Sequence, residues 1–500
     1  MIAKAFRNLS RASCAQIMGS TTLGVPATIQ SARHIFGFFG APEPSGPPLT
    51  EPLPDILAPS PAYLETGPPG TQLTTLSSGV RVATEATWGP TTALGVYVDA
   101  GSIYENETNA GVSHLLEQMA FKGTEHRTFF RVVRETEAFG GNVFASSSRE
   151  QMGYNVDCVR TNTAEAVELL LDAVLKPKFQ PWDLKAQADK IHAELMQLSK
   201  NPAFILQEGL HCTAYEGGLG RPLVLTPEAL HRLTPEVMEE FVAEHFTGPR
   251  IVLSGSGVEH SELVSLAQDM LADIPRNPPS GKPVPKVPSR YVGGEFRHPA
   301  LDSPQSTVVL AFEFAGGWKD VKGSVDVTVM QYLLGGGSSF SAGGPGKGMH
   351  SRLFRNILNG NPWITNCQAL GSLFNETGLV GITCTFESAA VQHIVPALSE
   401  QLIAIAQGVP EDELERAKRA AASSVLMNLE SKDVVCEDIG RQVLTYGHRK
   451  SAAEFVEAIR NVTVADLQRT MSKILKTPPT VAVHGNTRGV PRYDDICNMF

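Results

Sequence analysis

The sequence is poor in the features that mark a disulfide-stapled or zinc-thiolate protein. Its 500 residues hold only seven cysteines, an odd number, widely scattered and without any Cys-x-x-Cys pair. This pattern indicates reduced thiols in a reducing compartment. No stretch reaches the roughly 18 consecutive apolar residues of a membrane-spanning helix, so we expect no direct membrane span. A formal net charge of −10 argues against nucleic acid as the main partner.

Acidic residues are absent from the first 42 positions. The basic residues of this segment are Lys4, Arg7, Arg11 and Arg33. A basic, acid-free N-terminus without a long apolar core is typical of an organelle transit peptide. We therefore predict a transit peptide over residues 1–42, with a disordered basic tail as the alternative. Ten prolines lie in residues 41–70, which predicts an extended, proline-rich arm over residues 43–70.

Beyond residue 71 the chain repeats itself once. Ala93–Gly101 resembles Val308–Gly316, since both are runs of β-branched and aromatic residues that end in Ala-Gly. Further pairs follow in the same order, at an offset that grows to 230 residues: Tyr154–Cys158 with Val380–Cys384, Trp182–Leu184 with Asp412–Leu414, and the helix starts Leu233–Glu236 with Val462–Asp466. Several matches in one order indicate an internal duplication rather than chance similarity.

The duplication predicts an α+β protein with two similar domains, over residues 71–274 and 300–490. Each is expected to be a mostly antiparallel sheet with helices packed on one side. The two domains are expected to face each other across a cleft. Residues 275–299 carry seven prolines, which predicts a linker without regular structure.

The segment Gly111–Thr124 has the pattern of a short amphipathic helix that ends near Lys122. On such a helix His114, Glu117 and Gln118 share one face. A zinc peptidase needs two imidazoles at i and i+4, a third ligand, and a glutamate that takes a proton from the metal-bound water. Gln118 stands where the second imidazole is needed, and a neutral amide is a poor zinc ligand.

This motif, followed by Phe-Lys-Gly-Thr in a duplicated chain, resembles the pitrilysin or insulinase type of metallopeptidases. The resemblance implies a third ligand at Glu194, 76 residues after Gln118, in a helix over residues 184–198. His114, Glu117 and Glu194 match the family pattern and Gln118 departs from it. The resemblance therefore implies an eroded motif, with no catalytic residue and no metal ligand set in this chain.

The second distinctive segment, Gly335–Leu353, is rich in glycine and predicts a flexible loop between two helical stretches. A phosphate-binding loop is disfavoured, since Ser341 replaces the first glycine and Gly348 the magnesium-binding Ser or Thr. The segment resembles the glycine-rich loop of the non-catalytic subunits in heterodimeric mitochondrial processing peptidases, a branch of the same family. The resemblance implies these substrate-binding residues: Gly335, Gly336, Gly337, Ser338, Ser339, Phe340, Ser341, Gly343, Gly344, Gly346, Lys347 and Gly348.

By this resemblance the chain is expected to be a substrate-recognising subunit in the mitochondrial matrix or on the matrix side of the inner membrane. It would bind basic presequences of imported precursors for cleavage by a zinc-bearing beta subunit, holding no cofactor itself. Its acidic charge suits basic peptides. The alternative is a structural core subunit of respiratory complex III, which contacts other subunits of the cytochrome bc complex, and both roles can reside in one chain. Gln118 argues against a third possibility, an autonomous metalloprotease.

Overall fold

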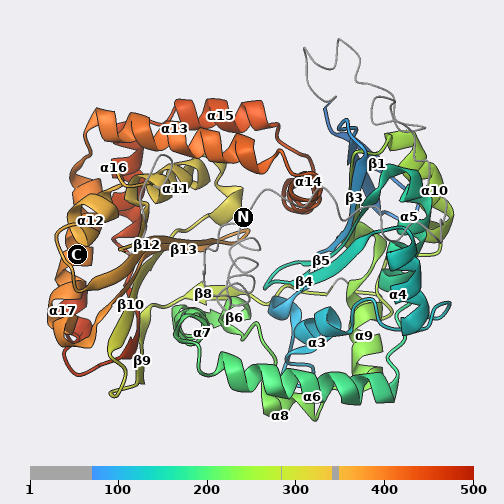
Figure 1. The fold of residues 1–500 in the computed structure, drawn as a ribbon, viewed down its shortest axis with the longest axis horizontal. Coiled ribbons are helices and arrows are strands. Elements are labelled where there is room, and N and C mark those ends of the chain that lie inside the picture. Colours follow the sequence, from blue (N-terminus) through green and yellow to red (C-terminus); the bar gives the residue numbers. More distant parts are fainter. Residues whose placement is uncertain (1–69, 283, 340–347) are drawn as a thin grey trace, which may run out of the picture. The chain divides into compact units, whose positions relative to one another are not determined.

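The computed structural model describes residues 70–500, apart from residue 283 and residues 340–347. The predicted transit peptide, and the predicted arm up to residue 69, lie outside the described residues. The described chain is built around two six-stranded sheets, each with its own set of helices (Figure 1).

The first half of the chain forms one sheet and most of the helices around it. Its strands are β1 (Gln72–Thr75), β2 (Arg81–Glu85), β3 (Thr91–Val98), β4 (Asn142–Ser147), β5 (Met152–Val159) and β7 (Ile251–Ser256). Its helices are α3 (Val112–Met119), α4 (Phe129–Ala138), α5 (Thr163–Leu175), α6 (Pro181–Leu198), α7 (Pro202–Ala214), α8 (Pro227–Leu230), α9 (Pro235–His245) and α10 (His260–Ala272).

The second half forms the other sheet. Its strands are β9 (Gly294–Pro299), β10 (Gln305–Glu313), β11 (Gly336–Ser338), β12 (Ile364–Leu373), β13 (Gly378–Glu387) and β14 (Thr480–Gly485). Its helices are α11 (Val321–Leu334), α12 (Val391–Gln407), α13 (Glu411–Asn428), α14 (Lys432–Tyr446), α15 (Ala452–Arg460), α16 (Val464–Ile474) and α17 (Tyr493–Cys497), together with a π-helical turn at Phe354–Leu358.

The two sheets share one topology. The order β2-β7-β3-β5-β4 in the first sheet corresponds to β9-β14-β10-β13-β12 in the second. In each, only the pair formed by the first two strands of this order is parallel, and the remaining pairs are antiparallel. The predicted duplication and the predicted α+β class with mostly antiparallel sheets are therefore confirmed.

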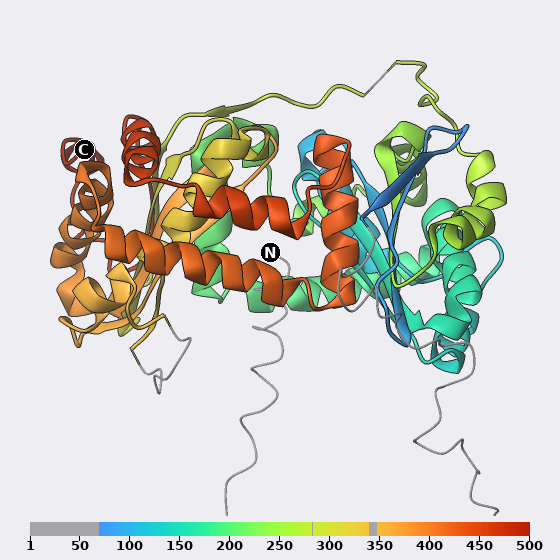
Figure 2. The ribbon, with the colours of Figure 1, turned by 90° about the horizontal axis from the view of Figure 1, so that it is seen from above.

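One prediction about the connection between the halves is wrong. Residues 275–299 were expected to lack regular structure, but they include β8 (Ser289–Tyr291), which pairs with β6 (Tyr215–Gly217), and the whole of β9. Proline excludes a strand only where its missing N–H is needed for the ladder. The strand β9 is an edge strand that reaches a proline only at its last residue, so the described part of residues 275–288 alone runs without helix or strand (Figure 2).

The central strand of each sheet is buried on both faces. Along β10, Val308 and Leu310 belong to the core of the second half, whereas Val309 and Ala311 join the core of the first half. Successive side chains of a strand point to opposite faces, so the second sheet touches two different hydrophobic cores. Its own helices pack on one side, as predicted, and a helix from the other half covers the opposite side.

The covering helices are exchanged reciprocally between the halves. Helix α14 of the second half packs on β3 and β7 of the first sheet, and α7 of the first half packs on β14 and β9 of the second (Figure 1). The stripe Val435, Ile439 and Val443 of α14 lies against Ala83 and Val252. The domain limits and the cleft predicted from the sequence stay predictions. Neither half covers both faces of its own sheet, because one covering helix comes from the other half.

In each of the two exchanged helices, a glycine allows the helix backbone to lie directly against an aromatic ring. A Cβ atom at Gly440 of α14 would lie 2.1 Å from the ring of Tyr97 on β3, and one at Gly209 of α7 would lie 2.4 Å from the ring of Phe296 on β9. The Tyr97 side chain is fully buried and its hydroxyl donates to Asn155. This ring therefore has no free space into which it could retreat.

Among the described residues, one helix is long and apolar enough, by length and composition alone, to cross a membrane: residues Ser388–Gln407, which include α12. Its residues Ile394, Leu398 and Leu402 belong to the core of the second half, and α12 packs on β10, β13 and α16. This helix therefore has the packing of a core helix.

We predict that Gly440→Ala destabilises the protein although alanine is the better helix former. Because a Cβ would lie 2.1 Å from the Tyr97 ring, the clash should cost about 2–3 kcal/mol, the upper part of the overpacking range, and outweigh the gain of about 1 kcal/mol in helix propensity. The measurement is the unfolding midpoint, with Ser423→Ala at an exposed position of α13 as the control. In a double-mutant cycle, Tyr97→Leu should reduce the cost of Gly440→Ala. An unchanged midpoint would contradict this account of the exchanged helix.

Candidate functional site

The helix α3, which carries the predicted motif, starts from a tightly constrained turn. Gly111 has φ +84°, and a Cβ there would lie 2.4 Å from Leu225 Cδ1. The buried carboxylate of Glu105 accepts hydrogen bonds from the backbone N–H groups of Gly111 (2.7 Å) and Ser113 (2.9 Å). A carboxylate at this end complements the helix dipole. Burial raises the pKa of Glu105, and the two N–H donors act in the opposite direction.

His114 is held as a buried, neutral imidazole. Its side chain is 7% exposed, and Nδ1 has no hydrogen-bond partner among the described residues. Burial lowers the pKa of His114 to about 4, because no neighbour compensates the cost of a buried positive charge. A neutral imidazole of this kind remains able to bind a metal as far as protonation is concerned.

Glu117 and Glu194 lie close enough to influence one another. Glu117 accepts hydrogen bonds from the Ser147 backbone N–H (3.0 Å) and hydroxyl (2.6 Å) on β4. Burial raises the pKa of Glu117; the bonds from Ser147 act in the opposite direction, and the carboxylate of Glu194 on α6 raises the pKa further. The structure thus brings Glu194 toward α3, as the resemblance implied.

Gln118 is bound to α6 by an amide–amide hydrogen bond. Gln187 Nε2 donates to Gln118 Oε1 at 3.0 Å, and the Gln187 side chain is only 5% exposed. Sequence reasoning missed Gln187. A signal was present, since Gln187 and Glu194 are seven residues apart and therefore lie on one face of α6. The side-chain oxygen of Gln118, which stands where an active relative carries its second imidazole ligand, thus joins α3 to α6.

These residues do not fit the zinc site of an active relative. Zinc in proteins prefers imidazole and thiolate ligands, and a catalytic site uses three protein ligands. Here one imidazole, His114, is accompanied by an amide whose oxygen already accepts a hydrogen bond. Within the part of the chain that the structure describes, no group of three or more His, Cys, Asp or Glu side chains is placed to hold a metal.

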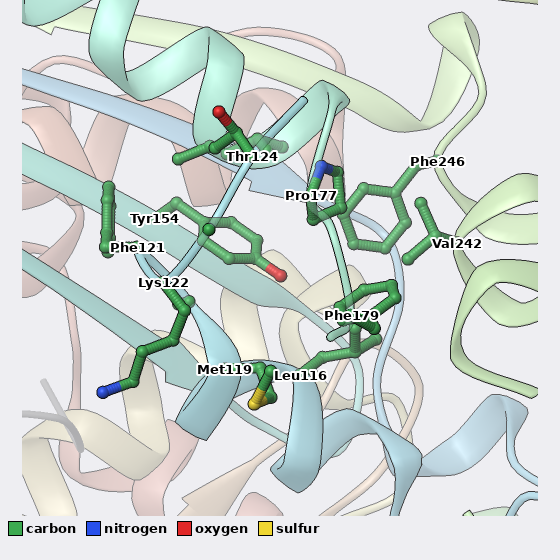
Figure 3. A pocket seen from close by; sticks show the side chains of 14 residues that line it. Leu116, Met119, Phe121, Lys122, Thr124, Tyr154, Pro177, Phe179, Val242 and Phe246 are labelled. Atoms are coloured by element: carbon green, nitrogen blue, oxygen red, sulfur yellow. The ribbon is translucent and has the colours of Figure 1, made fainter. Parts of the chain in front are cut away.

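The turn after α3 is anchored by aromatic packing around a very small cavity. Phe121 has φ 57°, which is the only positive φ of a non-glycine residue in the described chain and a strained conformation. Its ring packs edge-on against Tyr154, which packs in turn against Phe246, while Lys122 points away from the cavity (Figure 3). The cavity volume is about 10 Å³, which is close to the space of one water molecule. This cavity is too small for a peptide.

A buried polar cluster completes this turn. Thr124 Oγ1 donates to Asp172 on α5 at 2.6 Å, and Arg127 donates to the same carboxylate at 2.9 Å. Arg127 also pairs with Glu135 and Glu168. The Phe-Lys-Gly-Thr segment is thus a structural anchor that fixes the C-terminal end of α3.

The glycine-rich segment is only partly the loop that the sequence predicts. Gly336–Ser338 forms the edge strand β11, paired with residues 366–368 of β12, so the predicted loop is wrong at its start. Gly336 has φ +105°, and a Cβ there would lie 2.0 Å from the Cys367 carbonyl oxygen. Glycine is required here because the backbones approach so closely. The residues Phe340, Ser341, Gly343, Gly344, Gly346 and Lys347 lie outside the described residues.

The described ends of this segment are tied together and to their surroundings. The Gly336 N–H donates to Ser351 Oγ at 3.0 Å, and the Ser339 N–H donates to the Thr365 carbonyl at 2.9 Å. Just beyond, Arg352 donates to Glu413 on α13 at 2.8 Å. The described residues on either side of 340–347 are therefore held at a fixed place beside β12.

We predict that His114 makes stability depend on pH. The unfolded chain has the ordinary histidine pKa of about 6.5 and the folded chain about 4. The contribution is therefore fully present above pH 6.5 and is lost as the pH falls through 4, by roughly 3 kcal/mol. Unfolding of wild type and His114→Leu across this range measures the difference, with exposed His192→Leu on α6 as control. A constant difference between wild type and His114→Leu would contradict the prediction.

Two family models and several known proteins are similar to this chain in sequence. The family Insulinase (Peptidase family M16) matches residues 81–227, and the Peptidase M16 inactive domain matches residues 232–421. The chain is 45% identical to "Mitochondrial-processing peptidase subunit alpha" of Solanum tuberosum, over 91% of this chain and 89% of the relative.

The same similarity extends to other organisms. Identity is 44% to "Probable mitochondrial-processing peptidase subunit alpha-1, mitochondrial" of Arabidopsis thaliana, over 90% of this chain and 89% of the relative. It is 32% to the alpha subunit of Homo sapiens, over 90% and 88%. The predicted mitochondrial localisation is confirmed by these relatives. The chain belongs to the M16 peptidase family, among the alpha subunits of the mitochondrial processing peptidases.

Proposed function

We propose that this chain is the non-catalytic, substrate-recognising subunit of its processing peptidase. It binds the basic presequence of an imported precursor and presents it to a beta-type partner in the mitochondrial matrix. In that partner, zinc would supply the activated water that hydrolyses the peptide bond. This chain supplies binding and orientation, and it holds no cofactor of its own.

The observation that carries the proposal is the hydrogen bond between Gln187 and Gln118. The position that would carry the second zinc ligand in an active relative instead holds an amide, and its oxygen is occupied by a neighbouring helix. Without three ligands the chain has no means to activate water. The carboxylate of Glu117, which would act as the base, accepts two hydrogen bonds from Ser147 instead.

Two features support a role in binding presequences. The full chain carries 52 acidic and 42 basic side chains, and opposite charge raises the local concentration of a basic peptide. The glycine-rich segment starts and ends at a fixed place, through Gly336, Ser339 and Ser351. A glycine-rich segment between fixed ends is suited to close on a ligand.

A structural core subunit of respiratory complex III remains the alternative role. The two proposals differ in what accompanies the chain during purification from mitochondrial membranes. A core subunit co-purifies with cytochromes, whereas a matrix peptidase subunit co-purifies with its beta-type partner alone. A chain that does both appears in two separate fractions.

We predict that the isolated chain holds no stoichiometric zinc and that Gln118→His raises its zinc content to about one ion per chain. The substitution places an imidazole at i+4 from His114, where Glu194 is available as the third ligand. The measurement is metal content after dialysis, followed by calorimetric titration with zinc.

Two control variants separate the ligand set from other effects. Gln118→Ala removes the amide without adding a ligand and should bind no zinc. Adding Glu194→Gln to Gln118→His should abolish the gain. Stoichiometric zinc in the wild-type chain would contradict the non-catalytic assignment, and no gain in Gln118→His would contradict the assignment of Glu194.

We also predict that shortening the glycine-rich segment weakens presequence handling without preventing assembly. Residues 340–347 are replaced by a short Gly-Ser link, which leaves β11 and the Ser351 contact in place. With an intact beta-type partner, kcat/KM for a matrix precursor should fall about tenfold, equivalent to about 1.4 kcal/mol. The yield of heterodimer should stay unchanged, because a glycine-rich segment buries little apolar area.

The matched control keeps the length and changes the chemistry. A Gly-Ser stretch of equal length in place of residues 340–347 removes the side chains of Phe340 and Lys347. If these side chains contact the substrate, this variant loses activity as the short one does; if only length matters, it retains activity. Unchanged kinetics in both variants would remove the segment from the mechanism, and loss of the heterodimer would make it an assembly element.

A further inference from the structure

Two cysteines stand directly opposite each other in the second sheet. Cys367 on β12 is the register partner of Cys384 on β13 in an antiparallel pair. Directly opposed residues of such a pair project to the same face, with Cα atoms about 4.5–5.5 Å apart. Disulfide-bonded cysteines have Cα separations of about 4.4–6.8 Å. The register alone therefore places the two thiols within bonding range without a large backbone movement.

The two thiols are in contact and enclosed by the core. Cys367 is 0% exposed and Cys384 is 1% exposed, and both belong to the hydrophobic core of the second half. The hydrogen bond between the two thiols, together with burial, raises the pKa of Cys384. Both cysteines are free thiols in the structure. The other described cysteines are not register partners of one another.

The pair lies one strand away from the glycine-rich segment. On its outer side, Cys367 is the register partner of Gly337 in β11. The three-residue strand β11 forms this edge of the sheet, and no described strand pairs with its outer side. Short edge strands open more readily than central ones. Local opening of β11 and β12 offers a route by which a small oxidant reaches the pair in the folded chain.

We propose that Cys367 and Cys384 are a modification site, at which a small-molecule disulfide such as oxidised glutathione forms a cross-strand disulfide. The thiolate of one cysteine attacks the oxidant, forms a mixed disulfide and releases one glutathione. The thiolate of the other cysteine then attacks the bound cysteine sulfur and releases the second glutathione. Two thiols and one small disulfide thus become one protein disulfide and two small thiols, and the two cysteine protons pass to the leaving thiolates. The proposal does not depend on the proposed function.

The experiment incubates the folded full-length chain with oxidised glutathione at mildly alkaline pH. Free thiols are then blocked by alkylation, and unreduced peptides are identified by mass spectrometry. We expect a peptide pair linked through Cys367 and Cys384, formed over minutes to hours and reversed by a dithiol reductant. Compared with the untreated chain, the oxidised chain should have two fewer alkylated thiols, at Cys367 and Cys384.

Internal controls are present in the same chain. Exposed Cys212 should form a mixed disulfide and so report that the oxidant was active. Buried Cys158 and Cys436 should form no protein disulfide, because neither lies opposite another cysteine. Cys384→Ala should abolish the linked peptide while leaving the reaction of Cys212 intact.

Two results would overturn the proposal. It fails if Cys367 and Cys384 are both recovered unlinked while Cys212 has reacted. It also fails if the link forms only after the chain has been unfolded in denaturant. Neither outcome involves a presequence or a partner subunit, so the result is independent of the tests of the proposed function.

Discussion

The reciprocal packing of α14 on the first sheet and α7 on the second is the interaction on which the rest of this structure depends. The central strands β3 and β10 are apolar on both faces, and a sheet with two apolar faces needs cover on both sides. Each half covers only one face of its own sheet. In α14, Val435, Ile439 and Val443 supply the missing cover, and burying each such side chain contributes about 1.5–3 kcal/mol.

This exchange also explains why each of the two covering helices carries a buried glycine that faces an aromatic ring. A helix that lies directly on an aromatic ring needs a residue without a side chain at the point of contact. Gly440 meets Tyr97 and Gly209 meets Phe296, one in each exchanged helix. The two exchanged helices therefore use the same device, a glycine against an aromatic ring, on strands that do not correspond in the two sheets, since β3 matches β10 and β9 matches β2.

In the N-terminal half, polar contacts rather than a metal hold α3 against the neighbouring elements. The carboxylate of Glu105 fixes the start of the helix, Glu117 is bonded to Ser147 on β4, and Gln118 is bonded to Gln187 on α6. The hydrogen bond between the two amides joins α3 to α6 without a cation. The helix can thus keep its place in the fold without zinc, which is consistent with membership among the alpha subunits.

The sequence by itself determined the duplication, the α+β class, a short helix within Gly111–Thr124 and the departure at Gln118, because these depend on local periodicity and on residue identity. It predicted too little regular structure in residues 275–299 and in Gly336–Ser338. Prolines and glycines indicate which backbone conformations a segment can adopt, and not which one it adopts in the fold. The tertiary structure alone decided that α14 covers the other half's sheet, that Gln187 binds Gln118 and that Cys367 faces Cys384. Some of these contacts join the two halves and others join neighbouring elements, but the partners in each are set by strand register, helix packing and which apolar faces remain uncovered, none of which the local sequence pattern encodes.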